Sequence, residues 1–321
     1  MSANRSERKH NRLRLGLIGD GTRAFIQEGR RTENYNLLDL IHGYLYGRWP
    51  YLYIGIGIGE HPISSAVRRV SELIQRVLPW KRNSDRKPGS VAESYHGKVV
   101  PLNVARQLVS VNQDIRIPDL EQVIPYSKAR SLILNNPSHI IALDCPCRSS
   151  RSNPCLPLDV CLIIGEPFAG FVHEHHPDKS RWLSASEAEA ILFEEHQRGH
   201  AHHAFFKDAM LNRFYAICNC CSCCCGAMQA MRNGSPMLAS SGFVSVVDFD
   251  DCIGCGDCVE LCPFEAIELM DETACIAHDK CMGCGLCVDK CSMAALRLEL
   301  APDRGVPFEI GALMQVAAES T

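Results

Sequence analysis

The segment CNCCSCCC at residues 218–225 has cysteine at six of its eight positions. Neighbouring thiolates repel one another, so they cannot all ionise unless a cation compensates their charge. Crowded thiols that stay neutral are prone to oxidation. Metal binding removes both problems, and four more cysteines lie upstream in DCPCRSSRSNPCLPLDVC. The ten candidate metal ligands are Cys145, Cys147, Cys155, Cys161, Cys218, Cys220, Cys221, Cys223, Cys224 and Cys225.

Three kinds of site are compatible with these ten thiols. We favour at least one iron–sulfur cluster. A structural zinc ion is an alternative, because four thiolates suit zinc equally well, and a redox-active dithiol without metal is another. We expect 218–225 to be an irregular loop that shares a site with Cys145 and Cys147, and with Cys155 or Cys161, because consecutive extended residues point apart. Arg148 would then lie beside a negative centre and raise its reduction potential.

A different cysteine pattern occurs twice near the end of the chain. CIGCGDCVELCPFEAIEL begins at 252 and CMGCGLCVDKCSMAALRL begins at 281, and the two copies match at nine of 18 positions. Each copy has the spacing C-x2-C-x2-C-x3-C, whose first three thiolates can surround one cubane cluster while the fourth points away. We expect a strand before each copy, over 243–250 and 274–279, and a helix-like run after each fourth cysteine.

This repeat resembles the bacterial ferredoxin with two [4Fe-4S] clusters, over residues 243–300. Ser292 departs from the family pattern, which usually has proline there. A zinc ribbon is disfavoured because it has two C-x2-C pairs instead of two quartets. The resemblance implies that each fourth cysteine serves the other cluster. It implies one cluster on Cys252, Cys255, Cys258 and Cys291, and one on Cys281, Cys284, Cys287 and Cys262.

The other cysteines carry less information. The middle pattern is similar to that of cysteine-rich iron–sulfur proteins of anaerobes with a C-terminal ferredoxin module. Its paired cysteines are weakly similar to those of heterodisulfide-reductase-type subunits, although the spacing differs. Cys275 lies in the apolar stretch ACIAH, and we expect it to be a buried, inert thiol.

The 321 residues suggest about two domains. We expect an α+β protein whose N-terminal and middle parts are mainly helical. The expected segments are a cysteine-free part (1–95), a cysteine-rich domain (96–240), a ferredoxin domain (241–300) and a tail (301–321). Polar linkers are expected at 81–90 and 232–242. Expected helices are 62–78, 101–111, 124–136 and 184–199, the last with a capping box of Ser184 and Glu187, and a buried strand is expected at 138–145.

Histidine and tyrosine are also concentrated. Five of the eight tyrosines lie in 35–53, where a core role is favoured over a docking patch. For the histidines we favour hydrogen-bonding and surface roles over a proton relay or metal ligation. Seven of the 13 lie in one region, namely His173, His175, His176, His196, His200, His202 and His203.

Charge and motifs limit the function. The net charge of −4 gives no basic field for nucleic acid. The apolar stretch YLYIGIGIG is shorter than the roughly 20 residues of a membrane span, and no export signal precedes it, so we expect a cytoplasmic protein of anaerobic metabolism. GIGIGE lacks the dinucleotide-binding spacing.

We therefore predict an electron-transfer protein that passes single electrons to or from a larger redox enzyme. One alternative is an oxidoreductase subunit whose middle-domain cluster acts on a disulfide or thioester. Another is a non-catalytic, cluster-bearing structural or assembly subunit.

Overall fold

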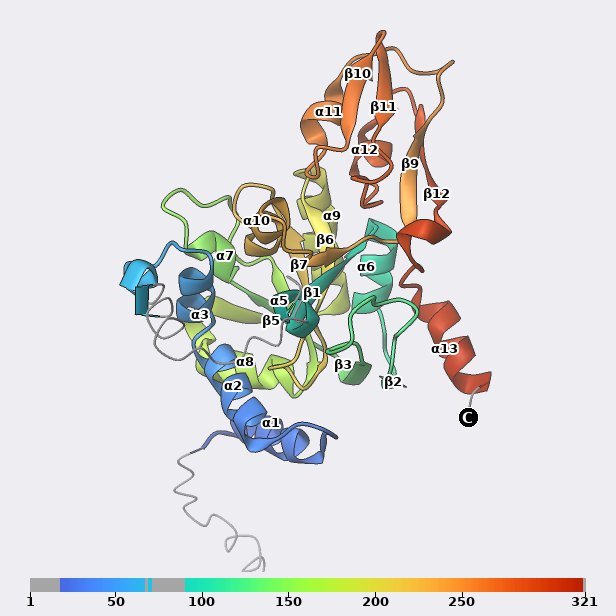
Figure 1. The fold of residues 1–321 in the computed structure, drawn as a ribbon. Helices are drawn as coiled ribbons and strands as arrows, with labels where there is room; N and C mark the ends of the chain where they lie inside the picture. Colours follow the sequence, from blue (N-terminus) through green and yellow to red (C-terminus); the bar gives the residue numbers. More distant parts are fainter. Residues whose placement is uncertain (1–17, 67–68, 71–89, 320–321) are drawn as a thin grey trace, which may run out of the picture.

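The computed structural model describes residues 18–66, 69–70 and 90–319 (Figure 1). The helix expected over 62–78 and the polar stretch 81–90 lie mostly outside these residues. Within the described part of the chain, no helix combines the length and apolar character that a bilayer crossing needs.

An eight-stranded sheet organises the body of the protein. The prediction of a mainly helical middle part is therefore wrong, although the structure does mix helices and strands. The path of the sheet is β2-β3-β4-β7-β6-β1-β8, and β5 pairs with β3 beside it. Every pairing is antiparallel except that of β1 with β8. The strands are β1 (Tyr95–Val100), β2 (Ile115–Ile117), β3 (Leu132–Leu143), β4 (Cys161–Glu166), β5 (Ser180–Leu183), β6 (Ala201–Lys207), β7 (Arg213–Cys220) and β8 (Leu238–Ala239).

Strand β3 corrects one sequence prediction and confirms another. The buried strand expected at 138–145 is its second half. The helix expected over 124–136 is wrong, because residues 124–130 are irregular chain with bends and β3 begins at Leu132. Pro137 restricts only Asn136, so the pattern of burial in 132–134 is the signal that was missed. Leu132 and Leu134 are buried with a less buried residue between them, which is the alternation of a strand.

Helices surround the sheet. The helices expected over 101–111 and 184–199 are confirmed as α6 and α9, and Ser184 and Glu187 form the capping box. Phe25 of α1 stacks on Phe171 of α8 with ring centroids 4.5 Å apart, which joins the N-terminal helices to the core. The helices of the body are α1 (Asp20–Arg31), α2 (Leu37–Arg48), α3 (Pro50–Gly57), α5 (Ser90–Ser94), α6 (Leu102–Val109), α7 (Pro146–Ser149), α8 (Phe168–His175), α9 (Ala185–Gln197), α10 (Gly226–Arg232) and α13 (Ile310–Glu319).

The two faces of the sheet carry different chemistry. Successive residues of a strand point to opposite faces. His202 of β6 contacts His196 of α9, so α9 covers its face. His203 points the other way and lies near Cys220 and Cys225. The cysteines thus gather on the face opposite α9.

The repeat forms a small module beside the body (Figure 1). Strands β9 (Phe243–Val247) and β12 (Leu296–Leu300) pair, as do β10 (Ile267–Met270) and β11 (Thr273–Ile276). Strands β9 and β11 confirm the strands expected before each copy. The helix-like runs expected after the fourth cysteines are wrong, because those segments are β10 and β12. The helices α11 (Asp257–Leu261) and α12 (Leu286–Lys290) lie before the fourth cysteines instead.

Lys98 of β1 is a buried cation, with 1% of its surface exposed. Among the described residues, no carboxylate lies within ion-pair distance of it. Burial disfavours the charged ammonium and lowers the pKa of Lys98 from 10.5 to about 8. Folding therefore costs more below pH 8, where this lysine must enter the core charged.

We predict that Lys98→Met stabilises the protein most at about pH 7, and that its advantage shrinks as the pH rises towards 10.5. Between the two pKa values the unfolded chain binds more protons, so the stability of the unsubstituted protein rises with pH. The measurement is the difference between the urea unfolding midpoints of the two proteins at each pH. Titration of the cysteines contributes equally to both proteins, so it cancels in this difference. The exposed Lys280→Met is the control, and an advantage that does not vary with pH contradicts the prediction.

Candidate metal centres

The first cysteine set of the module lines one pocket at its outer end. Cys252, Cys255 and Cys258 come from the loop before and the start of α11, and Cys291 follows α12. Burial, followed by the neighbouring sulfurs of Cys255, Cys252 and Cys291, raises the pKa of Cys258. Cys255 is exposed. The structure thus brings together the four residues that the ferredoxin resemblance implies for one cluster.

The second set is buried. Cys281, Cys284 and Cys287 are 8%, 9% and 9% exposed. Burial raises the pKa of Cys287 to about 11, with further contributions from Cys281, Cys262 and Cys258. Cys262 and Cys258 thus lie near the same thiol, so this set is close to the first. Backbone amides contact two of its sulfurs, from Ser245 to Cys281 at 3.4 Å and from Ala266 to Cys262 at 3.4 Å.

Glycine is required where the second loop crosses the start of β9. Gly283 has φ +63°, and a Cβ placed on it would lie 2.2 Å from the carbonyl oxygen of Phe243 and 2.2 Å from the Oγ of Ser241. Only glycine tolerates both the backbone angle and this close approach. The tight turn in turn lets the cysteines on either side face inward.

The second loop is part of the core of the body. Met282, Cys284 and Leu286 belong to the same hydrophobic cluster as Cys220 and Cys225. Hydrogen bonds fix the contact: the Ser241 amide donates to the Met282 carbonyl at 3.1 Å, and Lys290 Nζ donates to Gln197 Oε1 at 2.5 Å. The module is therefore held with its second loop against the body and its first loop outward.

A hydrogen-bonded chain also joins the two regions. His196 Nε2 lies 2.8 Å from Asp289 Oδ2 of α12, and His196 Nδ1 lies 3.3 Å from His202 Nε2. His202 Nδ1 contacts Asn219 Oδ1 at 2.7 Å. Asn219 lies between two cysteines of β7, and Asp289 lies between two of the module. Six of the seven clustered histidines make hydrogen bonds. A chain of this kind suits a proton relay as well as a structural role, so the favoured interpretation stays a prediction.

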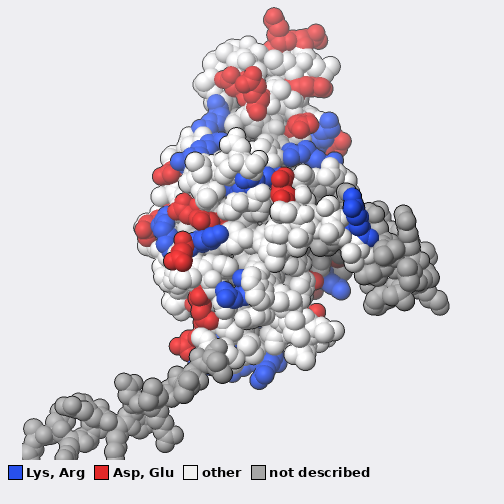
Figure 2. All heavy atoms as spheres, turned by 90° about the vertical axis from the view of Figure 1, so that its left-hand side faces the viewer, with Lys and Arg blue, Asp and Glu red and all other residues white. Residues whose placement is uncertain are grey.

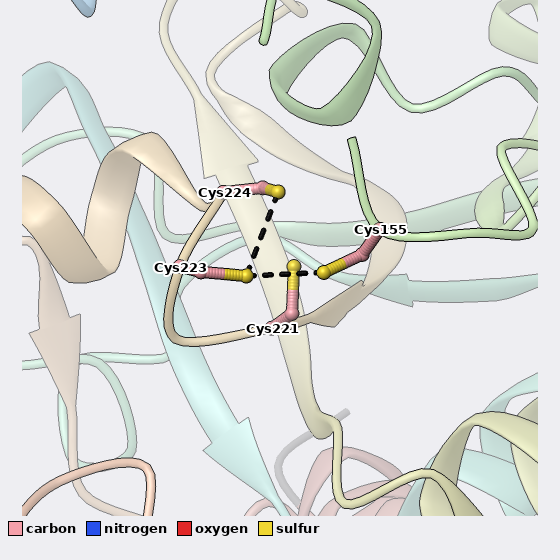
Figure 3. Close-up of side chains that lie close together, drawn as sticks. All are labelled: Cys155, Cys221, Cys223 and Cys224. Carbon is pink, nitrogen blue, oxygen red and sulfur yellow. Dashed lines mark hydrogen bonds between the residues drawn. The ribbon is translucent and has the colours of Figure 1, made fainter. Parts of the chain in front are cut away.

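Nine of the ten middle cysteines fall into two groups that share Cys221, and Cys161 lies beside Cys218 of the second group. Cys155, Cys221, Cys223 and Cys224 form a compact tetrad, whose sulfurs all lie within 4.8 Å of one another (Figure 3). Cys223 Sγ is 3.0 Å from Cys155 Sγ and 3.6 Å from Cys224 Sγ. Burial raises the pKa of Cys223, but hydrogen bonds with Cys155 and then Cys224 outweigh it and lower the pKa overall. Four thiolates this close suit a tetrahedral zinc ion or a cluster.

The second group surrounds a buried pocket under α10. Cysteine sulfurs from the end of β7, from the loop after β3 and from the start of α10 line it, together with Tyr95, Phe205 and Arg148. The six cysteines of the lining are Cys145, Cys147, Cys218, Cys220, Cys221 and Cys225. Even without Cys221, which also belongs to the tetrad, this set supplies the four thiolates that a cluster or a zinc ion takes. We name this site the inner pocket.

The thiols at the inner pocket differ in acidity. Hydrogen bonding to Cys161, 3.2 Å away, and burial raise the pKa of Cys218 well above its ordinary value. Contact with Cys220, and then with His203, lowers the pKa of Cys225 against the effect of burial. A bound cation would favour the thiolate form of every cysteine in this set.

Other sequence expectations met mixed outcomes. The stretch 218–225 is irregular only after Cys220, because β7 extends to that residue. Cys155 is part of the tetrad, and Cys161 lies beside Cys218. Both residues that were expected as alternatives for the shared site therefore lie close to a cysteine of 218–225. Arg148 does lie at the inner pocket, but Glu195 binds it at 2.5 Å and matches its charge, so its effect on the potential stays a prediction.

Burial also modifies two expectations. Cys275 is half-buried, less than expected. Among the clustered tyrosines, Tyr35 and Tyr46 are in the core, whereas Tyr53 is 42% exposed. His203 was not singled out as a ligand, because its approach to the cysteines depends on the pairing of β6 with β7.

Comparisons with known proteins agree with the geometry of the module. Residues 245–268 match the family model described as a 4Fe-4S binding domain. A 33-residue part, 10% of the chain, is 52% identical to Ferredoxin-2 of Desulfomicrobium norvegicum and spans 56% of that protein. No solved structure matches the chain significantly. These similarities support an iron–sulfur, ferredoxin-type module in this part of the chain.

We predict that Gly283→Ala lowers both the thermal unfolding midpoint and the iron content of the protein. The strained backbone alone costs on the order of 1–3 kcal/mol, and the contact with Phe243 adds to it. Gly311→Ala is the control, because a Cβ there meets nothing within 4 Å. Equal midpoints and iron contents for the two variants would show that the tight turn is dispensable.

Proposed function

We propose that this chain is an iron–sulfur electron-transfer protein. Two [4Fe-4S] clusters are assigned to the two cysteine sets of the module, and at least one further iron–sulfur cluster to the inner pocket. When bound, each cluster accepts or releases a single electron. The ligands proposed for the module are Cys252, Cys255, Cys258 and Cys291 in the outer set, and Cys281, Cys284, Cys287 and Cys262 in the second set.

The observation that carries the proposal is the order of burial along the molecule. Cys255 is exposed at the outer end, Cys284 is 9% exposed against the body, and Cys220 and Cys225 are 6% and 5% exposed behind it. The latter three share one hydrophobic cluster. Three sites in this order form a path from the surface into the protein, with apolar side chains that exclude water between them.

The residues around the second set adjust its electronic properties. The amides of Ser245 and Ala266 point at sulfur, and hydrogen bonds to sulfur raise the potential of a cluster. The outer set has greater solvent exposure. The two sites are therefore expected to differ in potential, as a directional path requires.

The chemistry of the partner follows from charge. Residues 241–300 contain 12 Asp and Glu against three Lys and Arg. Figure 2 shows acidic side chains gathered at the end of the molecule that the module forms. We therefore propose that a basic surface of a larger redox enzyme docks there, guided by long-range attraction.

The thiol content also favours a location. Nineteen cysteines without disulfides require a reducing compartment, so we propose the cytoplasm of an anaerobic cell. The exposed Cys255 makes damage by air an expected property.

A second function is favoured by one observation. Cys223 is exposed, has a lowered pKa and lies 3.0 Å from Cys155. An exposed thiolate beside a second thiol is the arrangement of a group that exchanges with disulfides. In this alternative the chain is an oxidoreductase subunit, and its tetrad reacts with a disulfide or thioester substrate.

We predict that the anaerobically prepared protein contains more than about eight iron atoms per chain, which is the content of two cubanes. Cys258→Ala is expected to lose one low-potential EPR signal and about four irons. Cys275→Ala is the matched control, since Cys275 lies in the module but outside both sets. Iron limited to about eight atoms contradicts the third cluster, and an unchanged spectrum in Cys258→Ala contradicts the assignment of the outer set.

The docking proposal predicts that Asp257→Lys with Glu260→Lys, both on exposed positions of α11, slows electron transfer to a basic cytochrome c. The expected loss at low ionic strength is about tenfold, and it shrinks as salt screens the attraction. Reversal of Asp119 and Glu121, on the body, is the control. An equal loss from the control pair means that net charge, and not the acidic end, controls association.

A further inference from the structure

His203 is a fully buried histidine, with 0% of its surface exposed. Its position on β6, opposite Cys218 of β7, turns it to the cysteine face of the sheet. One of its ring nitrogens and the sulfurs of Cys220 and Cys225 all lie within 4.8 Å of one another. The imidazole therefore stands at the edge of the inner pocket.

The ring of His203 lacks conventional partners. Among the described residues, neither Nδ1 nor Nε2 makes a hydrogen bond of good geometry, and the polar group that the ring faces is the thiol of Cys225. Its neighbour in sequence, His202, has both nitrogens engaged, with Asn219 and His196. A buried polar group that lacks a well-formed hydrogen bond is destabilising. Neutral imidazole is a common metal ligand, so a metal at this position would satisfy the ring.

We propose that His203 is a ligand of the cluster in the inner pocket, together with Cys220 and Cys225. This inference rests on the proposed function, because it takes the inner pocket to hold an iron–sulfur cluster. The remaining sulfurs of the pocket complete the site.

A histidine ligand changes the character of the cluster. Imidazole is neutral and thiolate is anionic, so replacing one thiolate by His203 makes the centre less negative by one charge. Histidine ligation raises the potential of iron–sulfur clusters for this reason. The inner pocket would then be the electron-attracting end of the path, and electrons that enter at the acidic end would collect there.

The test uses the full-length, anaerobically prepared protein. Pulsed EPR of the partly reduced wild type is expected to show strong coupling to a nitrogen nucleus, which changes when only histidine carries ¹⁵N. In His203→Cys the coupling is lost while iron is retained, and the midpoint potential of this signal moves to a more negative value. His96→Gln is the control, because His96 is also fully buried with an unpartnered Nε2 but stacks on Tyr126 and Phe206. Its spectrum and potential stay as in the wild type.

The outcomes separate the two proposals. A third cluster signal without histidine coupling in the wild type overturns the role of His203 and leaves the electron-transfer function standing, and this measurement needs no variant to fold. Iron of about eight atoms per chain, or one zinc in place of the third signal, overturns the cluster of the inner pocket and the ligand role with it. Coupling that survives in His203→Cys assigns the ligand to another histidine and overturns the inference.

Discussion

The crowding of buried sulfur is the constraint on which the rest of the structure depends. Cys161 and Cys218 have sulfurs 3.2 Å apart, and hydrogen bonding with burial raises the pKa of Cys218 well above its ordinary value. Such a group is unfavourable as several anions and reactive as neutral thiols, so it favours a bound cation. The antiparallel sheet gives it a rigid base, and α10 begins at the sulfur-bearing turn, so that segments far apart in sequence meet.

Local patterns with a specific spacing predicted local structure best, whereas the apolar runs of 124–136 and after the fourth cysteines were misread as helices. The spacing of the repeat fixes its loops within a few residues, and the capping box of Ser184 starts α9 as expected. Features that depend on distant pairing were missed. Four central strands, β1, β4, β6 and β7, were hidden because they are buried almost throughout and so lack the polar alternation of exposed strands. His203 could be placed near cysteines only once the register of β6 on β7 was known.

The contact between module and body explains why the second cysteine set is buried. Met282 and Leu286 fill the core of the body, while Ser241 and Lys290 fix the edges of the contact. Loss of this loop would therefore expose apolar surface on both parts. The positions of the inner pocket and of the second set are accordingly coupled through packing, which holds their separation constant, as the proposed electron transfer would require.

The internal repeat gives the module approximate twofold symmetry, and the body breaks it. Ile253 and Asp257 of the first copy correspond to Met282 and Leu286 of the second. Ile253 is 63% exposed, whereas Met282 and Leu286 are 3% and 1% exposed. A symmetric module could dock through either copy, and an aspartate at the position of Leu286 would leave an unpaired charge in the core. The Asp257–Leu286 difference thus selects one of two orientations, and so decides which of two otherwise similar loops faces the solvent.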